Sequence, residues 1–302
     1  MSDKNTLVIV TIVGGSVLKN CISENISADT QCIVITSNEE DMGLQKDFPG
    51  LSFINGSSLP VPAKRLEGAR ACQTEYVTFL EDTCMMMNPL WEVSAISVFE
   101  NNINTAAMSG PIEIGDDLAG QYKALACTEY GRYHPAFYKD LEIDSSDVSY
   151  SNVSRLPGSF MMYRLDALKE VIDHDEGLIE VLVNNKLREQ GGVLIMHTDL
   201  STRYSGEDVH GARLSARRQH GRLYAGKISS GDSFPARVIM FSKAFLLPMV
   251  LSLRGIHYAR RILKASDLPS VVIWIICMET FWSMGEAWGY LFGAGKSIEA
   301  WG

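Results

Sequence analysis

The sequence predicts an α/β protein with a mostly parallel sheet flanked by helices, followed by an apolar C-terminal helical region. Short runs of apolar and β-branched residues alternate with helical segments, which is the pattern of parallel strands joined by crossover helices. These runs cover residues 7–14, 32–36, 51–55 and 76–80. A chain of 302 residues can hold one large domain with an appendage, so we expect domains at 1–230 and 231–302.

The first elements fit this class in order. Residues 7–14 form a nearly continuous apolar run, as expected for a strand that is covered on both faces. Gly14 and Gly15 follow as a strand-to-helix turn, and they lack both the GxGxxG pattern and the Lys-Ser/Thr pair of phosphate-binding loops. A helix is predicted over 61–71, because Pro62 stands near its start and small apolar residues follow.

The stretch 76–91 is the most informative part of the chain. A buried strand over 76–80 ends abruptly in two carboxylates, Glu81 and Asp82. Ligands of open α/β sheets bind at the carboxyl ends of the strands. Paired negative charge beside a core is unfavourable unless something offsets it. A divalent cation that carries a phosphorylated donor would do so, and the structural alternative is that both acids belong to a turn or a helix cap.

The alternation continues after this stretch. The spacing predicts a helix over 93–99 and a strand over 105–110. A clearer helix over 178–188 ends at Gly191 and Gly192, a normal C-terminal stop, and a strand over 193–197 follows.

The last seventy or so residues change character. Residues 238–253 are apolar and interrupted by Pro248, and 268–295 are rich in Trp, Ile and Phe. Neither run clearly exceeds the roughly 20 residues that span a bilayer. Trp and basic residues suit a membrane interface, so we expect peripheral or re-entrant contact with a membrane surface. The alternative is a helical subdomain that contacts the main domain or a partner chain.

Charge and cysteine content restrict the function classes. The net charge of −9 argues against a nucleic-acid-binding protein, although a basic segment lies between residues 200 and 240. The six cysteines show no metal-type spacing, which indicates buried thiols in a reducing compartment. The N-terminus does not have the charged-then-apolar form of a signal peptide, so we expect a location on the cytoplasmic side.

The order of these segments resembles a family. AKRLEGARACQTEYVTFLEDT and PLW, then GSFMMYR, then an acidic helix leading to LREQGG, and a late RRQHGR are similar to family 2 glycosyltransferases of the membrane-associated bacterial type. The resemblance covers roughly residues 5–230, and its most specific part is 65–91. It implies the GT-A fold, a Rossmann-like sheet that binds a nucleotide-sugar donor.

The resemblance also implies roles for acidic residues. Glu81, Asp82 and Thr83 occupy the family's DxD-type motif, with Asp82 as the metal ligand for Mg²⁺ or Mn²⁺. Thr83 stands where a second ligating carboxylate is usual, which puts the metal site in doubt. Glu39 takes the place of the residue that meets the nucleotide base.

Catalysis and leaving-group binding are assigned in the same way. Glu180 is the expected general base that deprotonates the acceptor hydroxyl, with Asp175 and Glu176 as competitors. Arg217, Arg218 and Arg222 resemble the basic region that binds the diphosphate, and the alternative is a solvated basic helix beside a membrane.

The expected function is transfer of a sugar, with inversion, to a hydroxyl of a lipid-linked or polysaccharide acceptor. A catalytically inactive GT-A scaffold is the alternative favoured by Thr83, and a homo-oligomer is left open. A sugar nucleotidyltransferase ranks low, because it would need a basic, Gly-rich loop directly after the first strand.

Overall fold

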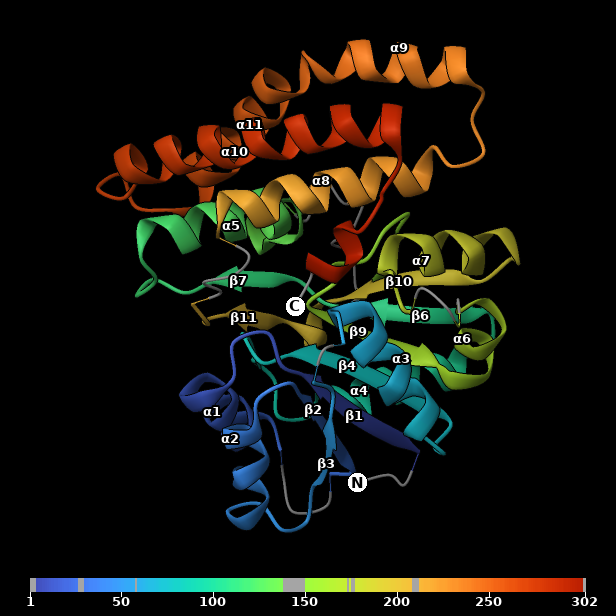
Figure 1. The fold of residues 1–302 in the computed structure, drawn as a ribbon. Helices are drawn as coiled ribbons and strands as arrows, with labels where there is room; N and C mark the ends of the chain where they lie inside the picture. The colour runs from blue at the N-terminus through green and yellow to red at the C-terminus, as the bar shows by residue number, and fades with distance from the viewer. Residues whose placement is uncertain are drawn as a thin grey trace. The chain divides into compact units, whose positions relative to one another are not determined.

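The computed structural model of the 302-residue chain describes residues 4–26, 30–57, 59–137, 150–172, 174, 177–207 and 212–300 (Figure 1). The chain divides into two compact units. Unit 1 contains residues 1–113 and 133–206, and unit 2 contains residues 114–132 and 207–302. This division differs from the expected boundary at residue 230, because two helices that precede it belong to the C-terminal unit.

Unit 1 is built on an eight-stranded sheet in the order β3-β2-β1-β4-β9-β6-β10-β8. Its strands are β1 (Asn5–Val10), β2 (Cys32–Thr36), β3 (Ser52–Asn55), β4 (Tyr76–Glu81), β6 (Thr105–Ser109), β8 (Tyr150–Asn152), β9 (Phe160–Arg164) and β10 (Val193–His197). The pairs β1–β2, β1–β4, β2–β3 and β6–β10 are parallel. The predicted α/β architecture with a mostly parallel sheet is therefore confirmed.

The strand β9 runs antiparallel between β4 and β6. Its first residue, Phe160, pairs with Leu80 at the carboxyl end of β4, so the preceding segment reaches the functional edge of the sheet. The backbone carbonyl of Ser159 accepts a hydrogen bond from the Glu81 N–H at 2.9 Å. This reversal brings residues 158 and 159 beside the acidic end of β4.

Helices flank this sheet within unit 1. They are α1 (Gly15–Asn25), α2 (Glu39–Met42), α3 (Val61–Ala71), α4 (Trp91–Asn101), α6 (Leu165–Val171) and α7 (Glu180–Glu189). The strands β1 and β2 are buried along their whole length because both faces are covered, as their continuous apolar sequence predicts. A second, three-stranded sheet joins β5 (Cys84–Met86), β11 (Thr202–Tyr204) and β7 (Ile112–Ile114).

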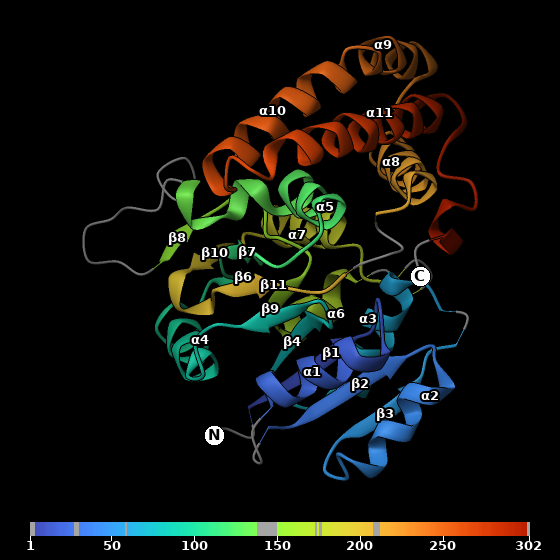
Figure 2. The same cartoon turned by 90° about the vertical axis from the view of Figure 1, so that its left-hand side faces the viewer.

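Unit 2 is helical. It contains α5 (Gly120–Tyr130), α8 (Leu214–Ile228), α9 (Phe234–Ala244), α10 (Leu247–Ile262) and α11 (Leu268–Phe292). The long helix α11 contacts all four others, most extensively α8, and α10 lies along it (Figure 2). Close approach of α8 and α11 requires glycine, because a Cβ on Gly221 or Gly285 would overlap backbone atoms of the facing helix.

Within the described residues, α11 is long and apolar enough to cross a membrane. The helices α9 and α10, which are bent by 53° at their junction, pass the same test as a pair. The break lies just before Pro248, which occupies the first turn of α10, where a missing N–H is tolerated.

Candidate active site

Asp82 follows β4 directly and is almost completely buried. Its carboxylate accepts hydrogen bonds from the backbone N–H groups of Ile12 (2.9 Å), Val13 (3.1 Å) and Gly14 (2.7 Å). Successive N–H groups that converge in this way form an anion-binding concavity. Here the protein's own carboxylate occupies it, so the turn after β1 is fixed against the end of β4.

A second buried carboxylate holds the same turn. Asp41, on α2, accepts a hydrogen bond from the Gly15 N–H at 2.7 Å and another from the Thr36 hydroxyl at 2.9 Å. Gly14 and Gly15 have positive φ, and a Cβ on Gly14 would lie 2.5 Å from an oxygen of Asp41. We call residues 12–15 with Asp41 and Asp82 the loop clamp.

Lys64 supports the loop clamp from α3. Its ammonium donates a hydrogen bond to the backbone carbonyl of Thr11 at 3.1 Å. Burial lowers the pKa of Lys64, although the nearby charge of Asp82 acts in the opposite direction.

Arg65, also on α3, joins the two acidic residues for which the sequence predicts separate roles. The guanidinium is buried and donates to Glu81 Oε1 at 2.8 Å, to Glu180 Oε2 at 3.0 Å and to the carbonyl of Gly158 at 3.0 Å. Glu180 is the first residue of α7, so the helix start sets its position. We call these four residues the Arg65 cluster.

The Arg65 cluster leaves both carboxylates partly open to solvent. The side chains of Glu81 and Glu180 keep 15% and 18% exposure, whereas Arg65 keeps 2%. Gly158 allows the close approach, because a Cβ there would lie 3.0 Å from Glu180 Oε1. A buried cation thus fixes two carboxylates at the carboxyl edge of the sheet, where a polar ligand can reach them.

Thr83 is buried and enclosed by backbone. Its carbonyl accepts hydrogen bonds from the N–H groups of Ser205 (2.9 Å) and Gly206 (3.1 Å). A Cβ on Gly206 would lie 2.7 Å from the Thr83 Cα. The residue that replaces the usual second carboxylate therefore anchors the segment that follows β11.

Other predicted residues lie apart from these groups. Glu39 starts α2 with an exposed side chain, and it is Asp41, two residues later, that reaches the turn after β1. Asp175 and Glu176, the competitors of Glu180, lie outside the described residues. The nucleotide-binding role of Glu39 and the choice among the three candidate bases stay predictions.

The basic residues of α8 make contacts inside unit 2. Arg217 is buried, pairs with Glu129 and lies over the Trp282 ring at 4.7 Å from its centroid. Arg222 donates from Nε to the carbonyl of Gly293 at 3.1 Å, and Arg218 is exposed. Arg217 and Arg222 thus stabilise the helical unit, and the diphosphate role of the three arginines stays a prediction.

The fit of a divalent cation can be judged from the same contacts. Both Asp82 oxygens already accept backbone hydrogen bonds, and Glu81 is paired with Arg65. Among the described residues no group of three or more His, Cys, Asp or Glu side chains is arranged to hold a metal ion. This part of the chain does not present a metal site of its own, and the role of Asp82 as a metal ligand stays a prediction.

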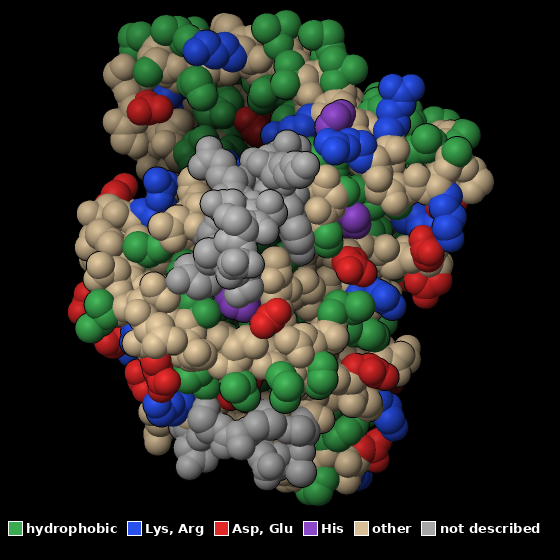
Figure 3. Space-filling model, turned by 180° about the vertical axis from the view of Figure 1, so that it is seen from behind, with side chains coloured by type: hydrophobic (Ala, Val, Ile, Leu, Met, Phe, Trp, Pro, Cys, Tyr) green, Lys and Arg blue, Asp and Glu red, His purple; other side chains and the backbone are tan. Residues whose placement is uncertain are grey.

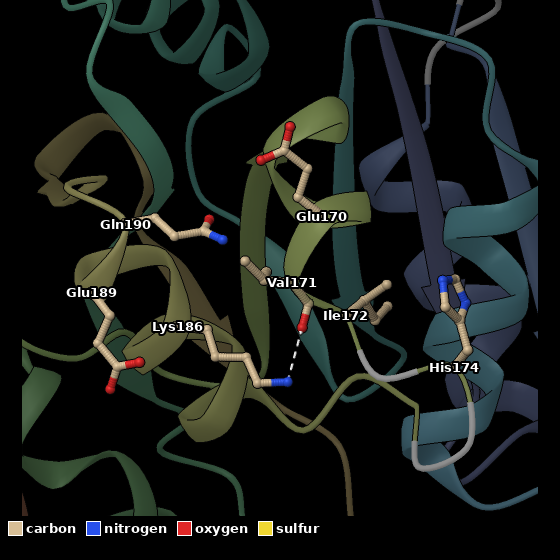
Figure 4. A pocket seen from close by; sticks show the side chains of 7 residues that line it. All are labelled: Glu170, Val171, Ile172, His174, Lys186, Glu189 and Gln190. Atoms are coloured by element: carbon tan, nitrogen blue, oxygen red, sulfur yellow. Dashed lines mark hydrogen bonds between the residues drawn. The ribbon is translucent and has the colours of Figure 1, made fainter.

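A pocket in unit 1 lies between the C-terminal ends of α6 and α7 (Figure 4). The ammonium of Lys186 donates to the Val171 carbonyl at 3.3 Å across it. Glu189, at this end of α7, is nine residues or about 13 Å along the helix from Glu180. The pocket is therefore separate from the Arg65 cluster, and no predicted site residue lines it.

Sequence reasoning missed Arg65 and Asp41. Arg65 stands in a helix with small apolar residues, where a single cation suggests a solvated surface. A weak signal existed for Asp41, because Asn38 followed by acidic residues is typical of a short capped helix after β2.

Comparison with known sequences gives no match: no family profile and no curated protein matches the chain. Solved structures do match in fold. A mannosyltransferase from Pyrobaculum calidifontis, in complex with GDP-Man and Mn²⁺, has a TM-score of 0.59 at 11% identity over 95% of this chain and 86% of its own. TarS of S. aureus, residues 1–349 with UDP-GlcNAc, has a TM-score of 0.51 at 12% identity over 94% and 91%.

GalNAc-T7 with UDP, GalNAc and Mn²⁺ has a TM-score of 0.51 at 10% identity. The match covers 68% of this chain and 43% of that protein, so the chain spans less than half of its length. At these identities the comparisons establish the architecture only. The chain has the fold of the GT-A glycosyltransferases.

Proposed function

We propose that the chain is an inverting glycosyltransferase that moves a sugar from a nucleotide-diphosphate donor to a hydroxyl of a lipid-linked or polysaccharide acceptor. The Arg65 cluster at the carboxyl edge of a GT-A sheet is the observation that carries this proposal. The similar structures contain GDP-Man, UDP-GlcNAc or UDP, which supports a nucleotide-sugar donor. Membership of family 2 and hexosyl transfer are part of the proposal.

Glu180 is the proposed general base. Arg65 holds Glu180 Oε2, which fixes the carboxylate and leaves Oε1 as the oxygen that takes the acceptor proton. The acceptor oxygen then attacks the anomeric carbon, and the bond from that carbon to the phosphate oxygen breaks. The nucleoside diphosphate departs with the bonding electrons, and Arg217, Arg218 and Arg222 remain the proposed diphosphate contacts.

Divalent metal dependence is proposed only as a property to be measured. Two of the similar structures contain Mn²⁺, whereas the described residues do not present a site for it. The mechanism above therefore derives no step from a metal ion, and release of nucleoside diphosphate with Mn²⁺, with Mg²⁺ or with EDTA measures the requirement.

The test of the function is Glu180→Gln. We expect transfer to fall by about 100- to 10,000-fold because a general base is lost. Thermal stabilisation by the preferred nucleotide sugar should persist, since the donor still binds the folded state. Glu189→Gln, at the exposed end of the same helix, is the matched control and should keep wild-type transfer. Wild-type transfer by Glu180→Gln would remove this residue from the mechanism.

The second candidate is an inactive scaffold for glycan synthesis. Asp82 and Thr83, the motif residues, are both engaged by backbone groups, which favours this alternative. Calorimetric titration with a panel of nucleotide sugars separates the two functions. A scaffold shows no binding, whereas a transferase binds at least one donor.

We also propose that the enzyme works at the cytoplasmic side of a membrane, as a peripheral or re-entrant protein. Exposed large hydrophobic residues on the C-terminal helices support this location.

A further inference from the structure

The segment of α9 and α10 has a charge unlike that of the rest of the chain. Residues 234–266 contain no Asp or Glu and six basic residues, namely Arg237, Lys243, Arg254, Arg260, Arg261 and Lys264. The segment therefore carries +6 in a chain with a net charge of −9, so the remaining residues sum to −15. Such a separation of sign indicates attraction to an anionic surface.

The same segment exposes large hydrophobic side chains. Figure 3 shows hydrophobic side chains gathered in the upper part of the view, with Lys, Arg and His side chains beside them. At the bend between α9 and α10, Phe245 is 69% exposed and Leu246 63% exposed. Met249, Val250 and Leu253 continue this exposure along α10.

The exposed side of α10 is divided along its length. Leu246, Met249, Val250 and Leu253 are followed by Arg254, His257, Arg260 and Arg261, all exposed. Helical spacing places these positions on one face. The opposite face is small and buried: Ser252, Gly255 and Ala259 face inward, and a Cβ on Gly255 would lie 2.9 Å from Ile275 of α11. The outer face is therefore apolar at the bend and basic towards the C-terminus.

A bilayer surface fits this order better than a second copy of the chain. The apolar half of α10, from Leu246 to Leu253, is about 10 Å long, which is too short to cross a hydrocarbon core of about 30 Å. It is long enough to enter the boundary between headgroups and acyl chains, with basic residues at the phosphates. In a two-fold dimer this face would meet itself, and the arginines of the two copies would repel each other.

The helix α11 is not free to act as the anchor by itself. Its Glu279, Ser283 and Glu286 are buried, and a Cβ on Gly285, on the same stretch, would overlap the Arg218 backbone of α8. Withdrawal of α11 into a bilayer would expose these carboxylates to hydrocarbon, which is strongly unfavourable.

We propose that the outer face of α9 and α10 docks the protein on an anionic lipid bilayer. Phe245, Leu246 and Met249 enter the headgroup–acyl boundary, and Arg254, Arg260 and Arg261 bind lipid phosphates. This inference rests on the proposed membrane association and names the surface responsible for it. It is independent of sugar transfer.

The experiment is flotation of the full chain with vesicles of phosphatidylcholine alone or with about one third phosphatidylglycerol. The wild type should float with the anionic vesicles and be released by 1 M salt, which shortens the range of electrostatic attraction to about 3 Å. Arg254→Gln/Arg260→Gln/Arg261→Gln should lower partitioning by about 100-fold, because each basic residue contributes roughly a tenfold factor near such a surface. Phe245→Ser/Leu246→Ser should also lower it.

Matched controls lie in unit 1. Ile103→Ser removes a hydrophobic side chain that is 84% exposed, and Lys46→Gln removes an exposed charge; both should float as the wild type does. Unchanged flotation of the Phe245→Ser/Leu246→Ser variant would overturn the proposal. So would a wild type that ignores anionic vesicles and forms a dimer that this double substitution abolishes, because the face then binds a second copy.

Donor hydrolysis, measured without vesicles, separates this inference from the proposed function. The flotation variants should keep wild-type hydrolysis. A chain that floats as expected but binds and cleaves no nucleotide sugar would refute the transferase and leave the docking surface intact.

Discussion

Asp82 shows how one residue can be assigned two different roles. As a metal ligand it would bind a cation through oxygens that are open to the donor. In the loop clamp its oxygens accept three backbone N–H groups instead. The two roles predict different consequences of substitution, and stability is the property that distinguishes them.

We expect Asp82→Ala to lower the free energy of unfolding by about 2–3 kcal/mol, because it leaves the N–H groups of residues 12–14 without their charged acceptor. Urea unfolding measures the change. Asp47→Ala, in which a half-exposed acid is removed, is the control and should stay within about 0.5 kcal/mol of the wild type. A stable Asp82→Ala protein that has lost only Mn²⁺-dependent donor binding would favour the metal role.

Individual residues were predictable from the sequence only in part. The acidic end of β4 was visible because Glu81 and Asp82 interrupt an apolar run. The partner of each acid was not, because Arg65 pairs with Glu81 across 16 positions and with Glu180 across 115. A local pattern identifies a carboxylate at a sheet edge, but whether it contacts a ligand, a cation or a distant loop depends on the tertiary fold.

At the scale of elements, the contact of α8 with α11 depends on glycine. In an open helix interior, Gly→Ala stabilises by about 1 kcal/mol. At Gly285 we expect the opposite sign, a loss of about 1–3 kcal/mol, because the new Cβ would overlap the Arg218 carbonyl oxygen. Thermal unfolding of Gly285→Ala measures this. Met284→Ala, one position away and 53% exposed, should change stability little, and a more stable Gly285→Ala protein would show that the helices do not approach so closely.

Glu279 on α11 should make the stability of unit 2 depend on pH. Burial raises the pKa of Glu279 above the usual 4.5, and the nearby Arg217 and Arg254 only partly oppose this, while Glu129 and Glu286 add to it. A raised folded-state pKa means that the stabilising contribution is complete below pH 4.5 and is lost as pH rises through the raised value.

Glu279→Gln should therefore raise Tm at pH 8 and change it little at pH 4, when both proteins carry a neutral side chain. Thermal scans across this range measure the difference between variant and wild type. Glu189→Gln, an exposed acid in unit 1, should show no such trend. A Glu279→Gln protein that is less stable at pH 8 would mean that the ionised carboxylate is stabilised by Arg217 instead.

Secondary structure was more predictable than strand direction. The helix α3 and the strands β2 and β10 have the predicted bounds, because each is a short patterned segment between clear turn signals. The antiparallel course of β9 was not predictable, since alternation of buried side chains is the same in either direction. The three-residue strands of the second sheet are too short to show a period.

At the scale of the whole molecule, the division of the chain is the least local property. The sequence predicted a boundary at residue 230, where the composition becomes apolar. The compact units place α5 and α8 with the C-terminal helices instead. Composition changes where exposed hydrophobic residues begin, whereas a unit is defined by which buried faces meet.

This difference yields a prediction for a chain truncated after residue 230. Without α10 and α11, the buried faces of α5 and α8 would be open to water, and Arg217 would lose Trp282. We expect the truncated chain to aggregate or to bind a hydrophobic dye strongly, and to lose cooperative unfolding of α8. A full chain cleaved once at Gly231 is the control, since its two pieces keep every contact between helices and should stay together in gel filtration. A soluble 1–230 fragment with the Tm of the intact protein would instead support the boundary that composition suggests, and would mean that α5 and α8 need no partner from the C-terminal helices.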